Sequence, residues 1–139
     1  MSYWDDVKFE QFKGKIFKSV EVSEDNAAIV FEDTNGDRYL MYHRQDCCES
    51  VYIEDIAGDL QSLVGHEIMQ AEEICNEYRD KLDDWDESYT WTYYKLATSN
   101  GYVTIRWYGT SNGYYSESVD LIKVDDDSSE YALEEHFNK

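Results

Sequence analysis

Three Asn-Gly dipeptides constrain the fold of this chain more than any other feature. They lie at Asn35-Gly36, Asn100-Gly101 and Asn112-Gly113, and runs rich in Tyr, Trp, Thr, Val and Ile flank them. Asn-Gly between such runs is the strongest short-range signal for a β-hairpin, because both residues accept the positive φ that a tight turn needs. The sequence therefore predicts a fold dominated by antiparallel sheet.

Residues 88–121 contain two of these dipeptides, so they are expected to form a three-stranded antiparallel meander. A two-residue turn at Asn100-Gly101 places alternate residues of the first two strands on opposite faces. One face is a candidate core face, on which Leu96 faces Ile105 and Tyr94 faces Trp107. The other face pairs Lys95 with Arg106 and Tyr93 with Tyr108, and carries Trp91 beyond them.

The Lys95–Arg106 pair has two interpretations, because like charges directly opposite each other destabilise a sheet. In the first, a second two-residue turn at Asn112-Gly113 brings Glu117 next to Arg106, and the two form an internal ion pair. In the second, the face is a cationic, aromatic-lined pocket for a ring-bearing anion such as a nucleotide. The pattern alone leaves both open.

The rest of the chain predicts a second meander and two short helices, giving a single α+β domain over residues 1–139 whose sheet curls or approaches a barrel. A hairpin at Asn35-Gly36 is expected to pair Asp33 with Arg38, Phe31 with Leu40, and Ile29 with Tyr42. Three further strands are expected: one over 15–22 with Ile16, Val20 and Val22 on one face, one over 51–55, and one over 67–77, where a strand is preferred to a helix. Two helices are expected, one over 56–64 that ends at Gly65, and a C-terminal one over 130–137 with Ser129 as its N-cap. Residues 79–87 and 123–130 are expected to be charged loops.

The excess of acidic residues limits the kinds of partner that this chain is expected to bind. The net charge is −19, with 31 acidic residues against 12 basic ones. Affinity for phosphate backbones needs a cationic surface, so direct binding to nucleic acid or to an anionic membrane is not expected. Such a chain instead suits the basic groove of a nucleic-acid-binding protein. The acidic runs Asp83, Asp84, Asp86 and Glu87, and Asp125, Asp126 and Asp127, are the candidate interaction surface; the alternative is that they only maintain solubility.

A second cluster of candidate residues follows the predicted strand over 38–43. It contains His43, Arg44, Asp46, Cys47, Cys48 and Glu49. A cysteine nucleophile needs a base and a lowered pKa, which His43 supports and the neighbouring acids oppose. Adjacent cysteines rarely bond to each other, so free thiols that pack as small apolar residues at the strand end are favoured, with Cys75 also free. An enzyme is not predicted, and a Cys/His-based activity remains the alternative.

No metal or cofactor is expected. Zinc needs four suitably spaced ligands, and His43, Cys47 and Cys48 supply at most three. DTNGDR at 33–38 begins like a calcium loop, but Arg38 stands where that motif needs Gly. There is no apolar run of about 18 residues and no apolar signal-peptide core in MSYWDDVKFEQFKG, so a cytoplasmic protein is predicted.

Two blocks of the chain, YHRQDCCESVYIEDIAGDLQSLVG (42–65) and SYTWTYYKLAT with VTIRWYGTSNGYYSESVDL (88–98 and 103–121), resemble a family of small phage-encoded domains. The family supplies no established activity. The resemblance implies a phage origin, and a grouping of residues from both blocks. These are His43, Asp46, Cys47, Cys48, Glu49 and Asp55 in the first, and Trp91, Arg106, Trp107, Tyr108, Ser111, Asn112 and Tyr114 in the second. Tyr93 stands where the family pattern has Phe.

We therefore expect a small acidic binding protein of phage, acting in the host cytoplasm, that inhibits a host defence or nucleic-acid-binding protein by occupying its basic surface, as a DNA mimic does. The first alternative is sequestration of a signalling nucleotide in the aromatic and cationic pocket. The second is a structural or virion accessory role, which predicts a stable homo-oligomer. Charge favours the first hypothesis, because it belongs to the whole chain, whereas the pocket depends on an inferred strand register.

Overall fold

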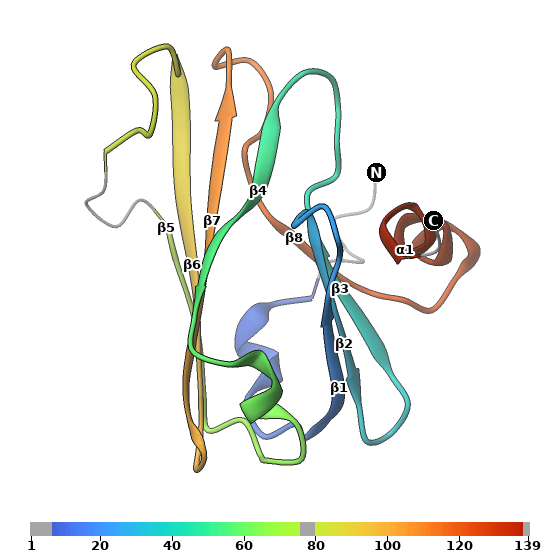
Figure 1. Cartoon of the computed structure of the whole chain (residues 1–139). Helices are drawn as coiled ribbons and strands as arrows, with labels where there is room; N and C mark the ends of the chain where they lie inside the picture. The colour runs from blue at the N-terminus through green and yellow to red at the C-terminus, as the bar shows by residue number, and fades with distance from the viewer. Residues whose placement is uncertain (1–6, 76–79, 138–139) are drawn as a thin grey trace.

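Two four-stranded antiparallel sheets pack face to face in the computed structural model, which describes residues 7–75 and 80–137 (Figure 1). The first sheet has the order β1 (Phe17–Val22), β2 (Ala28–Asp33), β3 (Arg38–Tyr42) and β8 (Asp120–Lys123). The second has the order β4 (Ser50–Ala57), β7 (Gly101–Ser111), β6 (Ser88–Thr98) and β5 (Gln70–Cys75). The predicted α+β fold of mainly antiparallel sheet is confirmed. Within the described residues the sheets stay separate, so the closed-barrel alternative is wrong.

Three short helical segments accompany the sheets in the described part of the chain. The 3₁₀ helices η2 (Phe9–Phe12) and η3 (Leu60–Leu63) each bury two apolar side chains in the core between the sheets. The helix α1 (Asp127–Phe137) packs on the outer face of the first sheet, away from the second sheet (Figure 1). Under α1 lies a separate cluster that includes Leu40, Tyr42 and Ile122.

The two long strands β6 and β7 present the predicted faces with a different register. Tyr94, Leu96, Ile105 and Trp107 lie in the core, as expected. However, the turn is formed by Ser99 and Asn100, and Gly101 is the first residue of β7, where it pairs with Thr98. The Thr98 hydroxyl accepts the Asn100 N–H at 3.0 Å and so favours this turn. The register differs from the prediction by two residues, and an even shift leaves every side chain on its face.

The new register removes the predicted like-charge pair. Lys95 faces Thr104 and Arg106 faces Tyr93, so Lys95 and Arg106 are not directly opposite. On the far side of β6, Lys95 faces Glu72 of β5. Leu96 faces Val103 instead of Ile105.

The β2–β3 hairpin has a three-residue loop where a two-residue turn was predicted. Asp33 and Asp37 close the loop by a backbone hydrogen bond of 2.9 Å, and the Asp33 carboxylate also accepts the N–H groups of Asn35 and Asp37. Gly36 has φ +88°, which is the left-handed conformation that ends a hairpin of this length. The register therefore moves by one, so that Glu32 and not Asp33 faces Arg38. Likewise Phe31 faces Tyr39 and Ile29 faces Met41.

The predicted third strand of the central meander leaves its sheet. The Ser111 hydroxyl and the Asn112 side chain accept the N–H groups of Gly113 and Tyr114, so the chain turns away after β7 instead of forming a tight hairpin. It then crosses over Gly109, where an added Cβ would lie 2.7 Å from the Glu117 carbonyl oxygen. The following strand, β8, pairs with β3 in the other sheet. There its apolar side chains are buried on both faces, Leu121 in the main core and Ile122 under α1.

Smaller corrections concern element boundaries. A bulge between Phe17 and Ser19 turns Phe17 and Val20 into the core and leaves Ile16 exposed. β4 extends to Ala57, so only Leu60–Leu63 of the predicted helix is helical. The strand over 67–77 is confirmed as β5, with residues 76–77 and the predicted loop residue Arg79 outside the described part. α1 begins at Asp127, because Asp126 and not Ser129 takes the N-cap role, its carboxylate accepting the Ser129 N–H.

Candidate functional site

Three loops meet at one end of the sandwich, which we call the loop end. They are residues 43–49 between β3 and β4, residues 80–87 before β6, and residues 112–119 between β7 and β8. Figure 1 shows them side by side at the top of the molecule. Loops carried on a rigid sandwich are common positions for binding residues, because they tolerate sequence change that strands do not. Most candidate residues predicted from sequence lie in or under these loops.

A buried pair formed by His43 and Glu49 joins two of the loops. The Nε2 atom of His43 lies 2.8 Å from a Glu49 carboxylate oxygen, and the exposed fractions of the two side chains are 4% and 0%. The Nδ1 atom lies 2.6 Å from the carbonyl oxygen of Ser118. A carbonyl and an ionised carboxylate only accept hydrogen bonds, so both imidazole nitrogens donate in this arrangement. The pair thereby ties the loop 43–49 to the loop 112–119.

The Glu49 carboxylate is the acceptor around which the loop 43–49 folds. It also accepts the N–H groups of Asp46 and Cys47, each at 2.8 Å. Burial raises the pKa of Glu49, but the hydrogen bonds from His43, Cys47 and Asp46 outweigh it and bring the pKa down to about 2. Glu49 is therefore ionised at neutral pH and holds the loop in one conformation.

The cysteines differ from the prediction. Cys47 and Cys48 form a disulfide between neighbouring residues, and both side chains are exposed, so they are neither free thiols nor packed apolar residues. The backbone around them is held by Glu49 and by the Gln45 amide, which donates to the carbonyl of Cys47. The two ring nitrogens of His43, the base that the alternative Cys/His-based activity would use, lie against Ser118 and Glu49. Cys75 is free and exposed, and burial with the nearby Glu73 raises its thiol pKa.

The loop 80–87 covers the aromatic end of the second sheet. The Tyr108 hydroxyl accepts the Leu82 N–H at 2.9 Å and donates to Asp86 at 2.5 Å. The Trp91 indole N–H donates to the Asp80 carbonyl at 3.0 Å. Trp91 and Tyr108 are almost completely buried as a result, with ring centroids 4.4 Å apart. Burial and the bond to Asp86 raise the pKa of Tyr108 to about 12, so the phenol stays neutral.

The three aromatic residues of the alternative nucleotide pocket, Trp91, Tyr93 and Tyr108, are buried. Arg106 binds Glu54, with atoms 2.5 Å apart, and approaches Asp55 at 3.5 Å. The internal ion pair with Glu117 is therefore wrong. The Glu117 carboxylate instead accepts the hydroxyls of Thr90 and Ser111.

Two aromatic side chains stand exposed at the loop end. Trp85 is 89% exposed and Tyr114 is 83% exposed. Tyr114 was a predicted candidate, whereas Trp85 was not. The available signal for Trp85 is its sequence context DDWDE, in which the aromatic side chain has two acidic residues on each side.

A cavity of about 240 Å³ at the loop end is lined by residues of all three loops. Cys48 and Glu49 come from the first, Trp85, Asp86 and Glu87 from the second, and Asn112 and Tyr115 from the third. The two sequence blocks that resemble phage-encoded domains therefore meet at this cavity, through Cys48, Glu49, Ser111 and Asn112. His43 and Tyr108 support the walls, while Arg106 and Lys95 lie further along the outer face of the second sheet.

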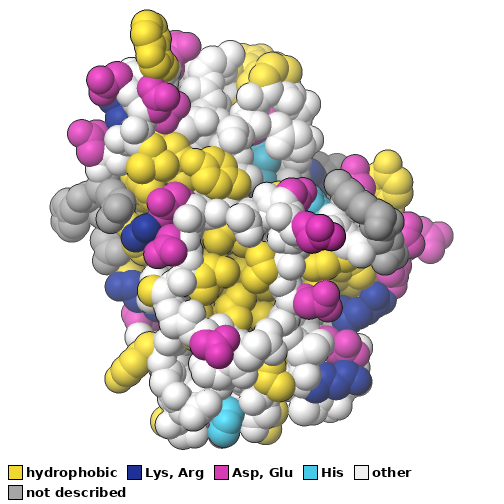
Figure 2. Space-filling view, in the orientation of Figure 1, with side chains coloured by type: hydrophobic (Ala, Val, Ile, Leu, Met, Phe, Trp, Pro, Cys, Tyr) yellow, Lys and Arg dark blue, Asp and Glu magenta, His cyan; other side chains and the backbone are white. Residues whose placement is uncertain are grey.

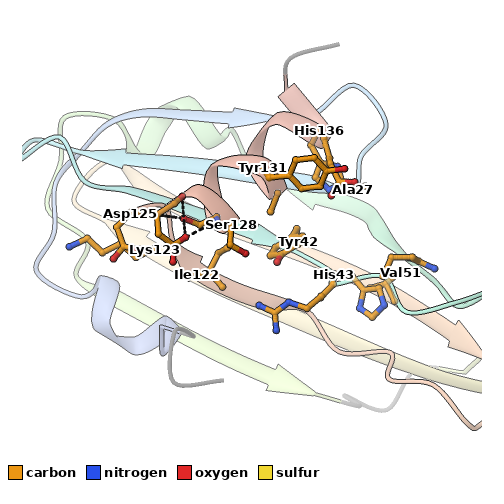
Figure 3. A pocket seen from close by; sticks show the side chains of 16 residues that line it. Ala27, Tyr42, His43, Val51, Ile122, Lys123, Asp125, Ser128, Tyr131 and His136 are labelled. Carbon is orange, nitrogen blue, oxygen red and sulfur yellow. Dashed lines mark hydrogen bonds between the residues drawn. The ribbon is translucent and has the colours of Figure 1, made fainter. Parts of the chain in front are cut away.

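A larger cavity of about 590 Å³ lies between α1 and the first sheet (Figure 3). Tyr42, Arg44 and Lys123 contribute from the sheet side, and Tyr131 and His136 from α1. Asp125 and Asp126 of the second acidic run border this cavity, whereas Asp86 and Glu87 of the first run border the cavity at the loop end. Within that run Asp126 caps α1, and the hydrogen bonds from Ser129 lower its pKa.

Among the described residues, no group of three or more His, Cys, Asp or Glu side chains is placed to hold a metal ion. No helix in residues 7–75 and 80–137 is long and apolar enough to span a membrane. No curated protein and no solved structure matches the chain. A family model described as "Domain of unknown function (DUF7448)" matches residues 10–121, which is most of the chain without α1. The chain therefore belongs to the DUF7448 family of domains of unknown function.

Proposed function

We propose that this domain is a non-enzymatic binding protein encoded by a phage, which acts in the host cytoplasm and inhibits a defence or nucleic-acid-binding protein by covering its basic surface. The observation that carries the proposal is the net charge of −19 on 139 residues. The electrostatic field of a strongly acidic protein attracts a basic protein surface and speeds association with it. The phage origin rests on the likeness of the two sequence blocks to phage-encoded domains.

The distribution of charge supports this proposal. Figure 2 shows Asp and Glu side chains spread over the visible face, with few Lys and Arg side chains between them. Several of the cations are matched locally by acids, as in the pairs Arg38–Glu130, Arg106–Glu54 and Lys123–Asp37. At the loop end Asp83, Asp84 and Glu87 are exposed. The surface offered to a partner is therefore acidic.

The exposed aromatics give the same surface a source of affinity that charge alone lacks. Tyr and Trp are enriched among the residues that dominate binding energy at protein interfaces. Trp85 and Tyr114 are both exposed at the loop end. An acidic surface with exposed aromatics suits a protein partner, whose basic surface also offers apolar contacts.

The proposal is tested by measuring how the domain inhibits nucleic-acid binding by a panel of purified bacterial nucleases and nucleic-acid-binding proteins, at low and high salt. We expect inhibition of at least one member, weakening steeply as salt rises. Inhibition that is insensitive to salt, or inhibition of no member, contradicts the proposal.

Three matched pairs of substitutions then locate the surface, each removing two charges. One pair lies at the loop end, Asp84→Asn with Glu87→Gln, and one at the start of α1, Asp125→Asn with Asp127→Asn. The control pair, Glu10→Gln with Glu67→Gln, lies outside both acidic runs at exposed positions. Asp86 and Asp126 are left unchanged, because they hold Tyr108 and the α1 cap. Equal inhibition by all three variants contradicts an acidic interaction surface at either run.

A further inference from the structure

Trp85 is exposed on a loop whose backbone is fixed. The Trp85 N–H donates to the Asp83 side chain at 3.0 Å, and the residues on both sides are held by Tyr108, through the Leu82 N–H and the Asp86 carboxylate. Trp85 nevertheless remains 89% exposed and is one of the residues that line the 240 Å³ cavity. Its position is thus set before any partner arrives, which lowers the ordering cost of binding.

The charges that remain in this cavity are negative. Glu49 is paired with His43, and its side chain is fully buried. Asp86 accepts one hydrogen bond from Tyr108, and a carboxylate has room for more. Within the described part of the chain the Glu87 carboxylate has no hydrogen bond or ion pair. The residues that line the cavity therefore combine an exposed tryptophan, two carboxylates with acceptor capacity, and Tyr115.

We propose that this cavity is a subsite for one arginine side chain on the basic surface of the protein partner, which stacks on Trp85 and binds Asp86 and Glu87. This inference rests on the proposed function and names the chemistry of its contact. A guanidinium is flat, so it stacks on an aromatic face, and its fork of N–H donors matches carboxylate oxygens. A lysine ammonium has neither property, and is expected to bind the cavity more weakly.

The test uses small probes and the full chain. N-acetyl-arginine amide is titrated into ¹⁵N-labelled protein while the indole N–H signal of Trp85 is followed by NMR. The signal is identified by its absence in Trp85→Phe. Two matched probes are the lysine analogue, which carries the same charge, and the citrulline analogue, which is a neutral isostere of arginine. We expect saturable shifts at Trp85 and Glu87 with arginine, smaller shifts with lysine and none with citrulline.

Variants separate a built subsite from general attraction to an acidic protein. Glu87→Gln and Trp85→Ala are each expected to weaken arginine binding about two- to five-fold. The controls Glu67→Gln and Tyr102→Ala change an exposed acid and an exposed aromatic elsewhere, and are expected to leave it unchanged. Equal shifts with citrulline, or equal losses in the control variants, overturn the subsite. If salt-sensitive inhibition persists while the arginine probe does not bind, the subsite fails and the proposed function stands. If neither is found, both fail.

Discussion

At the scale of single residues, Glu49 is the position on which the loop end depends most. One carboxylate accepts from His43 and from the N–H groups of Asp46 and Cys47, and the imidazole continues to Ser118. Removing one partner of a buried hydrogen-bonded pair leaves the others unsatisfied, which costs more than the bond itself contributes. The effect of a change at Glu49 is therefore expected to reach two loops.

Glu49→Gln is expected to lower the free energy of unfolding by about 1–3 kcal/mol, because an amide cannot accept all of these hydrogen bonds. Urea denaturation of the variant and of the exposed control Glu87→Gln measures the difference. A loss in the control that equals the loss in Glu49→Gln contradicts the role of the buried pair.

The lowered pKa of Glu49 predicts that the stability of the fold depends on pH. The pKa of Glu49 is about 2 in the folded protein, below its ordinary value of 4.5. A carboxyl with a lowered pKa stabilises the fold fully above its ordinary pKa, and this contribution is lost as pH falls through the folded value. The difference in Tm between wild type and Glu49→Gln is thus expected to shrink as the pH falls from 4.5 toward 2. A difference that grows on acidification argues against it.

At the scale of elements, the loop 80–87 is a cover for the second sheet that is held from below. Its contacts run to Trp91 and Tyr108, which belong to the two long strands. The charged sequence of this loop predicts only a solvated segment, and the anchors come from residues 11 to 26 positions away. The strands therefore fix the conformation of a loop whose own sequence has no signal for one.

Tyr108→Phe removes the hydroxyl that bonds Leu82 and Asp86. We expect faster hydrogen exchange at Leu82 and its neighbours, and a stability loss of about 1 kcal/mol. Hydrogen exchange by NMR measures the first effect and denaturation the second. Tyr102→Phe, which removes a hydroxyl from an exposed tyrosine, is the matched control. Unchanged exchange at Leu82 in Tyr108→Phe shows that the hydroxyl does not hold the loop.

The helix α1 is the second element whose position depends on a local device. Ser129 is buried, and its hydroxyl accepts the N–H groups of Asp125 and Asp126, while Asp126 accepts the Ser129 N–H. This reciprocal arrangement is a capping box at the start of the helix. Arg38 on β3 then binds Glu130 one turn within α1. The capping box fixes the start of the helix, and the Arg38–Glu130 pair joins to the first sheet a helix that lies outside the residues matched by the family model.

Ser129→Ala is expected to cost about 1 kcal/mol and to destabilise α1 before the sheets. Hydrogen exchange in residues 127–137, compared with β2 and β3, separates local fraying of α1 from global loss. Ser128→Ala, at an exposed neighbouring position, is expected to have little effect. Equal effects from the two serines contradict the capping role.

At the scale of the whole molecule, charge opposes the fold. A net charge of −19 repels itself in the compact state, and the locally matched cations offset only part of it. Salt screens this repulsion between exposed charges. The acidity is thus a cost to the stability of the folded state.

The Tm of the domain is expected to rise when the salt concentration is raised from low to physiological levels at neutral pH. Differential scanning calorimetry measures it, with a neutral osmolyte at matched osmolarity as the control for effects unrelated to screening. A Tm that falls with salt means that attractive ion pairs outweigh the repulsion, which contradicts this account of the charge.

The sequence by itself determined the fold class and, in the two long strands β6 and β7, which side chains face the core. Alternation in β6 and β7 is a property of residues two positions apart, and it placed Tyr94, Leu96 and Ile105 in the core even though the register was predicted wrongly. Register itself was missed at both hairpins, because the side chains of Asp33 and Thr98 bond the turn backbone in ways that the Asn-Gly pattern does not specify.

Only the tertiary structure decided which strands share a sheet and which side chains are exposed. β8 pairs with β3, and this pairing buries an apolar side chain of β8 on each face of the sheet. One of them packs in the main core and the other packs under α1, so the pairing depends on both of these contacts. Trp91 and Tyr108 are buried because the loop 80–87, whose own Trp85 is exposed, lies over this end of the second sheet. His43 reaches Ser118, 75 residues away. Composition and periodicity report the preferences of neighbours in sequence, whereas pairing and exposure are set by contacts between residues that only folding brings together.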